Sequence, residues 1–240
     1  MAIQHRLRCA TDSLRLANRG TPEDTEDEAF MNLSKITAFV VRPNSGGVDV
    51  LTFRHPTAGR QFPAGTVEQG EGEIAAAIRE VREETGYVVR GEARRIETLI
   101  EQLPTGHAVI AWTSPEADID PALRRGIPVR LRQVRGEEAL VVREEFDFGV
   151  EPPPLINEVE AWMPTQSLAT TIARHFLLFV EPAAASGERE APYRHSADGH
   201  VFEVAWLPLS PELVFAGHQQ QWRETLRAAL RVEEGGTPTC

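Results

Sequence analysis

The chain has 240 residues, of which 41% are hydrophobic, and this predicts one domain with appendages. Its 25 basic and 36 acidic residues give a net charge of −11, which argues against a general nucleic-acid or membrane-surface binder. Cys9 and Cys240 lie near opposite ends and fit unpaired thiols of a reducing compartment. No run approaches the roughly 18 apolar residues of a membrane span. We therefore expect a cytoplasmic protein without a nucleic-acid or membrane partner.

The first part of the chain predicts a polar arm followed by strands. Residues 1–30 are polar and irregular, and we expect one globular domain over residues 31–232. Residues 35–43 are rich in β-branched and aromatic side chains, and residues 48–54 alternate in the manner of a strand. The turn-like Pro-Asn-Ser-Gly-Gly between them indicates a hairpin. Residues 60–65, RQFPAG, read as a third short strand that runs into a turn.

The middle of the chain predicts one clear helix and an insertion. The helix covers residues 72–85, and a strand is expected over residues 90–101. Residues 102–168 are less regular and read as an insertion that is not an independent domain. Within this insertion, residues 129–148 predict a β-hairpin that turns at Gly136.

The last part of the chain predicts two further strands and a closing helix. Residues 170–182 and 200–209 read as strands, separated by a polar loop over residues 183–199. We expect a helix over residues 211–232 and a disordered tail over residues 233–240. The apolar stripe expected on this helix consists of Leu213, Phe215, Trp222, Leu226 and Leu230. The irregular alternation of strands and helices after an early hairpin predicts an α/β fold with a mixed sheet between helices.

The helix over residues 72–85 gathers an unusual number of carboxylates. At about 100° per residue, Glu83 and Glu84 lie within roughly 60° of Glu80. The apolar residues expected to pack on the core lie on another sector: Ile74, Ile78 and Val81. A solvated charged face is the ordinary explanation for such a pattern, but three close carboxylates also suit a divalent cation such as Mg²⁺, Mn²⁺ or Ca²⁺. Because Mg²⁺ usually completes its shell with water and phosphate oxygens, the pattern indicates a phosphate-bearing substrate.

The segment Gly65–Tyr87 resembles the Nudix box, G-x5-E-x7-R-E-U-x-E-E-x-G-U, where U is a bulky apolar residue. The matching residues are Gly65, Glu71, Arg79, Glu80, Val81, Glu83, Glu84, Gly86 and Tyr87. Tyr87 departs mildly from the pattern because an aromatic ring replaces the usual aliphatic side chain. The resemblance implies the Nudix α/β/α sandwich, to which the insertion would add a β-hairpin. It also implies Mg²⁺-dependent hydrolysis of a nucleoside diphosphate linked to another moiety, with Mn²⁺ as a substitute.

The resemblance also implies roles for the residues of the box. The metal ligands would be Glu83 and Glu84, then Glu80, with the carbonyl of Gly65. We expect Arg79 and Glu71 to pair and to orient these glutamates, which completes a predicted catalytic set of Glu83, Glu84, Arg79 and Glu71. Gly86 fits a left-handed helix C-cap. The general base stays open: Glu83 and Glu84 come first, and the later candidates are Glu188, Glu190 and Glu203.

The substrate is indicated only weakly by the sequence. The stretch FPAGTVEQGE is similar to the equivalent stretch of Nudix enzymes that act on ADP-ribose and nucleotide sugars. Arg54 and Glu203 are the candidate substrate-binding residues. The alternative to an enzyme is a non-catalytic Nudix module that senses a nucleotide or binds a protein, but such modules usually lose box carboxylates, which are all present here.

Two further features outside the box have alternative explanations. The arginines of the insertion could hold phosphates or an acidic partner surface, although a solvated hairpin face is the favoured interpretation: Arg124, Arg125, Arg130, Arg132 and Arg135. A homodimer stays an open alternative, with the insertion as the expected place for association or substrate choice. His175 lies in an apolar run and is expected to be a hydrogen-bonded core histidine, not a ligand.

Overall fold

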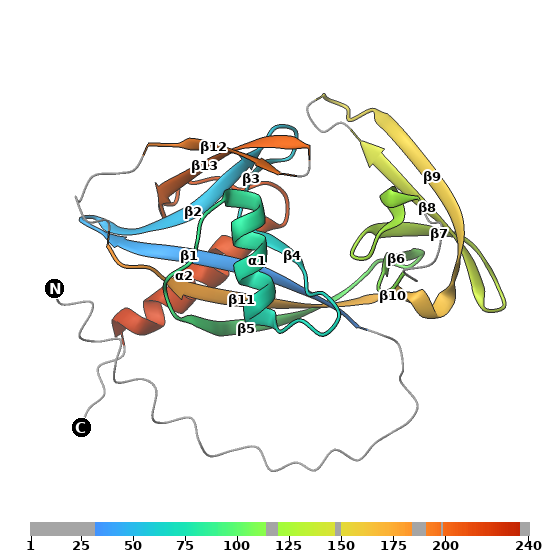
Figure 1. Cartoon of the computed structure of the whole chain (residues 1–240), viewed down its shortest axis with the longest axis horizontal. Coiled ribbons are helices and arrows are strands. Elements are labelled where there is room, and N and C mark those ends of the chain that lie inside the picture. Colours follow the sequence, from blue (N-terminus) through green and yellow to red (C-terminus); the bar gives the residue numbers. More distant parts are fainter. Residues whose placement is uncertain (1–31, 114–119, 147–149, 184–190, 198, 236–240) are drawn as a thin grey trace, which may run out of the picture.

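The computed structural model describes residues 32–113, 120–146, 150–183, 191–197 and 199–235 (Figure 1). Its main sheet has eight strands, and the order of six is β12-β13-β2-β1-β11-β5. The central strand β1 (Leu33–Asn44) pairs in parallel with β11 (Thr171–Val180) and antiparallel with β2 (Gly47–His55). The other strands of this mixed sheet are β3 (Gly59–Gln61), β4 (Ala64–Thr66), β5 (Ala93–Gln102), β12 (Tyr193–Ala197) and β13 (His200–Pro208).

Two helices cover opposite faces of the main sheet. Side chains alternate along β1, so Ile36 and Ala38 pack on one face with helix α1 (Glu73–Thr85). Phe39 and Val41 pack on the other face, against helix α2 (Gln219–Gly235). This arrangement, visible in Figure 1, confirms the predicted α/β fold with a mixed sheet between helices.

The insertion forms a second sheet of five strands, here called the accessory sheet. Its order is β10-β6-β7-β8-β9, and its hydrophobic core includes Leu123 and Val141. The predicted hairpin is present as β7–β8, with Gly136 in the left-handed region (φ 59°) at the turn. The strands are β6 (His107–Ile110), β7 (Pro128–Arg135), β8 (Glu138–Phe146), β9 (Leu155–Pro164) and β10 (Leu168–Ala169), and two short 3₁₀ helices are η1 (Pro121–Leu123) and η2 (Thr165–Ser167).

The chain leaves the main sheet at the end of β5 and returns to it at the start of β11, two points that lie side by side. The accessory sheet is inserted between β5 and β11, which pair antiparallel with Gln102 opposite Thr171. The next amide outward, that of Leu103, donates to the carbonyl of Thr170 at 2.8 Å. A small hydrophobic cluster that includes Val109 and Ala169 continues from this junction into the accessory sheet.

Two predicted elements have different limits in the structure. The predicted polar loop over residues 183–199 contains strand β12, whose five residues include few apolar side chains and so gave no strand pattern. The C-terminal helix begins at Gln219, not near Pro211, and continues to Gly235. Leu213 and Phe215 pack against the core from the preceding loop, while Trp222, Leu226 and Leu230 form the helical stripe.

The expected core face of α1 is wrong in part. Ile74 and Ile78 are 46% and 42% exposed, whereas Ala76, Ala77 and Val81 are buried. The small alanines permit a close approach to the sheet, which turns the larger isoleucines toward the side of the helix. No helix in the described part of the chain is long and apolar enough to cross a membrane. The predicted N-terminal arm and both cysteines lie outside the described residues.

Candidate active site

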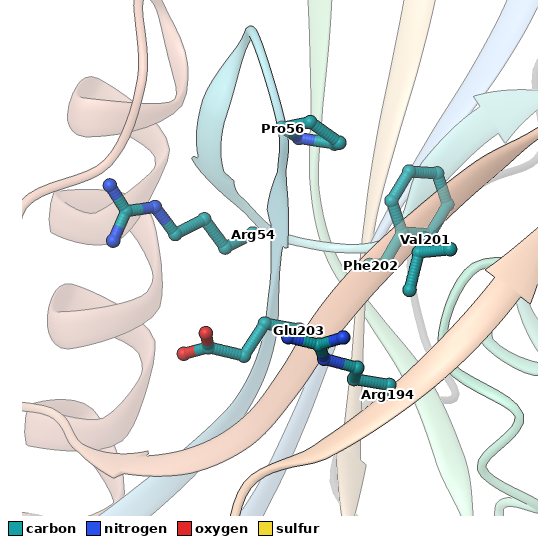
Figure 2. A pocket seen from close by; sticks show the side chains of 6 residues that line it. All are labelled: Arg54, Pro56, Arg194, Val201, Phe202 and Glu203. Atoms are coloured by element: carbon teal, nitrogen blue, oxygen red, sulfur yellow. The ribbon is translucent and has the colours of Figure 1, made fainter.

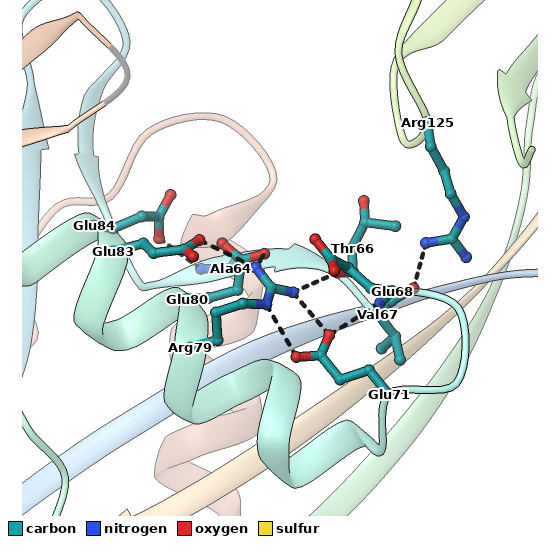
Figure 3. A network of polar contacts seen from close by, with 10 residues as sticks. All are labelled: Ala64, Thr66, Val67, Glu68, Glu71, Arg79, Glu80, Glu83, Glu84 and Arg125. Carbon is teal, nitrogen blue, oxygen red and sulfur yellow. Dashed lines mark hydrogen bonds and ion pairs between the residues drawn. The ribbon is translucent and has the colours of Figure 1, made fainter. Parts of the chain in front are cut away.

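Helix α1 and the loop before it form the acidic site. The loop that joins β4 to α1, residues 67–72, is here called the box loop. Gly72 is the N-cap of the helix and Gly86 its C-cap, with Gly86 at φ 70° and its amide donating to the carbonyl of Arg82. The predicted left-handed C-cap at Gly86 is therefore confirmed. With the small face of α1 against the sheet, the three glutamates project along the side that faces β4 (Figure 3).

Arg79 holds the centre of the acidic site. Its guanidinium donates to both carboxylate oxygens of Glu71, at 3.0 and 2.9 Å, and to the carbonyl of Thr66 at 3.0 Å. The same group donates to Glu80 at 2.8 Å and to Glu83 at 3.1 Å. These bonds lower the pKa of the Glu71 carboxyl and raise that of Arg79. The expected Arg79–Glu71 pair, which ties the box loop to the helix, is present in the structure.

Glu80 is the most enclosed of the three glutamates. Its side chain is 13% exposed, and burial raises the pKa of its carboxyl, although the Arg79 hydrogen bond acts in the opposite direction. The carboxylate lies directly against Gly65, where an added Cβ would be 1.9 Å from Glu80 Oε1. A side chain at this position would therefore displace the Glu80 carboxylate from its place beside the backbone of Gly65.

Glu83 and Glu84 lie at the C-terminal end of the acidic side. The Glu83 side chain is 56% exposed, and a Glu84 oxygen accepts from the backbone amide of Ala64 at 2.9 Å. These oxygen donors fit a hard divalent cation by type. In the described part of the chain, no three His, Cys, Asp or Glu side chains already converge as a metal cluster. Instead, Arg79 supplies the positive charge that faces Glu80 and Glu83.

Strand β12 contributes two contacts to α1 that no pattern in the sequence predicts. The Tyr193 hydroxyl donates to the carbonyl of Thr85 at 2.9 Å, and His195 Nε2 lies 2.8 Å from the carbonyl of Glu83. The His195 ring also packs on Gly86, where a Cβ would be 2.8 Å from Nδ1. These contacts satisfy carbonyls at the helix end and fix the last turn, which carries Glu83. In the sequence, the one indication of these contacts is a tyrosine and a histidine within an otherwise polar segment.

Arg54 and Glu203 lie opposite each other in β2 and β13, as Figure 2 shows. Together with Arg194 of β12 they line a shallow pocket of about 290 Å³. Their sequence neighbours Phe53 and Phe202 pack on the α1 side of the sheet, so alternation directs Arg54 and Glu203 to the other face.

The other predicted candidates divide between surface, core and undescribed positions. Arg130 pairs with Glu144 at 2.6 Å, and Arg132 pairs with Glu160, which agrees with the favoured solvated face of the hairpin. His175 is 8% exposed and lies 3.0 Å from the Thr98 hydroxyl, as expected of a hydrogen-bonded core histidine. The two later base candidates Glu188 and Glu190 fall outside the described residues.

Comparison with solved structures gives distant matches. The NUDIX domain of Shewanella oneidensis NrtR complexed with ADP ribose is 13% identical, covers 83% of this chain and 89% of its own, and has a TM-score of 0.42. The E. coli dihydroneopterin triphosphate pyrophosphohydrolase is 13% identical, with coverages of 82% and 95% and a TM-score of 0.43. A C. elegans Ap4A hydrolase is 14% identical, with coverages of 84% and 99% and a TM-score of 0.39. At these values the matches carry no argument about the substrate.

The search of curated proteins found no match. The family model described as NUDIX domain matches residues 32–109, about a third of the chain. This segment runs from β1 through β4 and α1, and it contains every residue of the Arg79 network. Residues 32–109 are therefore similar to a NUDIX domain, which agrees with the resemblance of Gly65–Tyr87 to the Nudix box.

Proposed function

We propose that the protein is a Mg²⁺-dependent pyrophosphohydrolase that cleaves a nucleoside diphosphate linked to another moiety. ADP-ribose or a nucleotide sugar is the favoured substrate, because Pro63 and Ala64 precede the box glycine as in Nudix enzymes of that kind. The observation that carries the proposal is the Arg79 network, which brings Glu71, Glu80 and Glu83 onto one side of α1 within the segment that is similar to a NUDIX domain.

The residues proposed to hold the cation are Glu80, Glu83 and Glu84, with the carbonyl of Gly65. A bound divalent ion would offset phosphate charge and acidify a water molecule. Arg79 donates to one carboxylate oxygen of Glu80 and to one of Glu83, so the second oxygen of each could bind the cation while these contacts stay. Arg79 would keep its bonds to Glu71 and to the Thr66 carbonyl, so that the box loop stays attached to the helix.

The proposed reaction is attack by water on one phosphorus of the pyrophosphate. The new P–O bond forms as the anhydride P–O bond breaks, and a carboxylate accepts a proton from the water. The products are a nucleoside monophosphate and the phosphorylated second moiety. We propose Glu83 or Glu84 as the base and no longer Glu203, because strand alternation places Glu203 on the face of the main sheet opposite α1.

Arg54 and Glu203 are proposed as substrate-binding residues at the far edge of the sheet. The guanidinium groups of Arg54 and Arg194, on the two strands that flank Glu203, suit phosphate oxygens, and Glu203 suits the hydroxyls of a ribose or sugar. Replacing Arg54 by Gln is expected to raise KM and to leave kcat nearly unchanged. An unchanged KM for the preferred nucleotide would remove the pocket from the proposal.

The test is a panel of nucleotides incubated with and without Mg²⁺, with products separated by chromatography. The panel includes ADP-ribose, nucleotide sugars, dinucleoside polyphosphates and nucleoside triphosphates. We expect Mg²⁺-dependent cleavage at the pyrophosphate, fastest for ADP-ribose or a nucleotide sugar. Faster cleavage of another class would correct the substrate and leave the reaction in place.

A non-catalytic nucleotide-sensing or protein-binding module is the second candidate function. The observation in its favour is that Arg79 occupies Glu80 and Glu83 in place of a converged set of ligands. Tight binding of a nucleotide without turnover, at any divalent ion concentration, would support this second candidate over the enzyme.

A further inference from the structure

The turn of residues 124–127, which precedes β7 of the accessory sheet, contacts the box loop. The guanidinium of Arg125 donates to the carbonyl of Ala111 at 2.7 Å from Nε, and Nη1 donates to the carbonyl of Val67. Ala111 directly follows β6, and Val67 is the first residue of the box loop. One side chain therefore links the two sheets at the loop that precedes the acidic helix, as Figure 3 shows for Arg125 and Val67.

The backbone of the same turn approaches β4 closely. Gly126 has φ 88°, and an added Cβ would lie 2.3 Å from the Thr66 hydroxyl oxygen. Its carbonyl accepts from Lys35 Nζ at 2.9 Å, and its amide donates to the carbonyl of Ile110 at 2.7 Å. Lys35 lies directly opposite Thr66 in the β1–β4 pairing. The turn is thus bound both to the main sheet and to the accessory sheet.

Two arginines from different elements hold consecutive carbonyls of the chain. Arg79, on α1, binds the carbonyl of Thr66, and Arg125, in the turn before β7, binds that of Val67. The next residue, Glu68, donates its amide to Glu71, the same carboxylate that Arg79 binds. A shift of the Val67 backbone would therefore move Glu71 and its partner Arg79. Because Arg79 also binds Glu80 and Glu83, the positions of these two carboxylates would change as well.

We propose that Arg125 is a positioning residue through which the accessory sheet fixes the box loop and thereby aligns the carboxylates of α1. That Arg125 fixes the position of the box loop is inferred from the hydrogen bonds alone. That it also affects catalysis rests on the proposed function. Arg125 acts through the backbone of Val67. Loss of its guanidinium would take this donor from the carbonyls of two buried residues, Ala111 and Val67, and a buried acceptor that loses its partner is destabilising.

The test compares Arg125→Gln with Arg124→Gln, the matched control at the exposed neighbouring position. The first measurement is deuterium exchange of residues 66–72 in the metal-free protein. We expect exchange there to be about tenfold faster in Arg125→Gln and unchanged in Arg124→Gln. Arg125→Lys keeps the charge but cannot bridge two carbonyls in the same way, so it should give an intermediate rate. It also serves as the informative variant if Arg125→Gln fails to fold.

Two further measurements separate this proposal from the proposed function. Mn²⁺ affinity and kcat are each expected to fall about 10- to 100-fold in Arg125→Gln, with a smaller change in KM. A wild-type protein that neither binds Mn²⁺ nor turns over nucleotides would refute the proposed function, while the exchange result would still decide the role of Arg125. Exchange in residues 66–72 equal in Arg125→Gln, Arg124→Gln and wild type would overturn the positioning role. Faster exchange confined to residues 107–169 would also overturn the positioning role, because Arg125 would then stabilise the accessory sheet and not the box loop.

Discussion

At the residue scale, the acidic site depends on how Arg79 distributes its hydrogen bonds. Two bonds go to Glu71 and hold the box loop, and two others go to Glu80 and Glu83. Glu84 has a separate partner, the backbone amide of Ala64. The three box glutamates thus have different surroundings: Glu80 is enclosed, Glu83 is exposed, and Glu84 is tied to β4. Substitutions at the three positions should therefore differ in their effects on stability.

Glu83→Gln and Glu84→Gln should each lower kcat by about a hundredfold, because each would remove one of the proposed charged metal ligands at nearly constant volume. Unfolding free energy should change little for Glu83→Gln, since that side chain is more than half exposed. Steady-state kinetics and urea unfolding test this, with Glu73→Gln as a control on the same helix. Near wild-type kcat in both variants would show that Glu83 and Glu84 do not bind the catalytic metal.

Lys35 should make stability depend on alkaline pH. Burial lowers its pKa to about 8, from 10.5. The folded state therefore disfavours the charged amine, a penalty present in full below pH 8 and relieved as pH rises toward 10.5. Relative to Lys35→Met, wild type should gain about 2–3 kcal/mol of unfolding free energy across that window. Parallel pH profiles from urea unfolding of the two proteins would contradict the lowered pKa.

At the element scale, the helices and strands that could be predicted are those that leave a pattern in a short stretch of sequence. The hairpin at the start of the domain, helix α1 and the strands β11 and β13 follow from apolar periodicity and glycine turns. Strand β12 could not be predicted because its side chains are polar and its role is to pair with β13 and hold α1. The box spacing identified Arg79 with Glu71, whereas the contact of Arg125 joins residues 58 positions apart and leaves no local pattern.

The orientation of α1 gives a direct test of the corrected core face. Ile78→Gln should change unfolding free energy by less than about 0.5 kcal/mol, because Ile78 is 42% exposed. Val81→Ala should cost about 2 kcal/mol, because Val81 is fully buried against the sheet. Urea unfolding of the two variants tests the assignment. A larger loss for Ile78→Gln than for Val81→Ala would restore the isoleucine face as the core face.

At the scale of the whole molecule, the main sheet and the turn of residues 124–127, which precedes β7 of the accessory sheet, meet at the box loop. The proposed cation site is assembled only in the folded protein, so metal binding is expected to raise the stability of the fold. A cation that binds the folded site alone stabilises by RT ln(1 + [L]/Kd), about 2.7 kcal/mol at 100 times Kd.

Mg²⁺ or Mn²⁺ should accordingly raise the melting temperature, and Glu83→Gln should reduce the shift. The measurement is thermal unfolding at millimolar divalent ion, with NaCl at matched ionic strength as the control. Equal shifts with NaCl would indicate general screening of a solvated acidic face instead of a site.

The pairing of Gln102 with Thr171 has a consequence for how such a molecule can diversify. Because the chain leaves and re-enters the main sheet at adjacent residues, the intervening sixty-odd residues behave topologically as one long hairpin loop. Such a segment can be exchanged or shortened over evolution without rethreading the sheet that carries it. Arg125 limits this freedom: a replacement would preserve the scaffold, but it would have to supply a new donor for Val67 to preserve the loop.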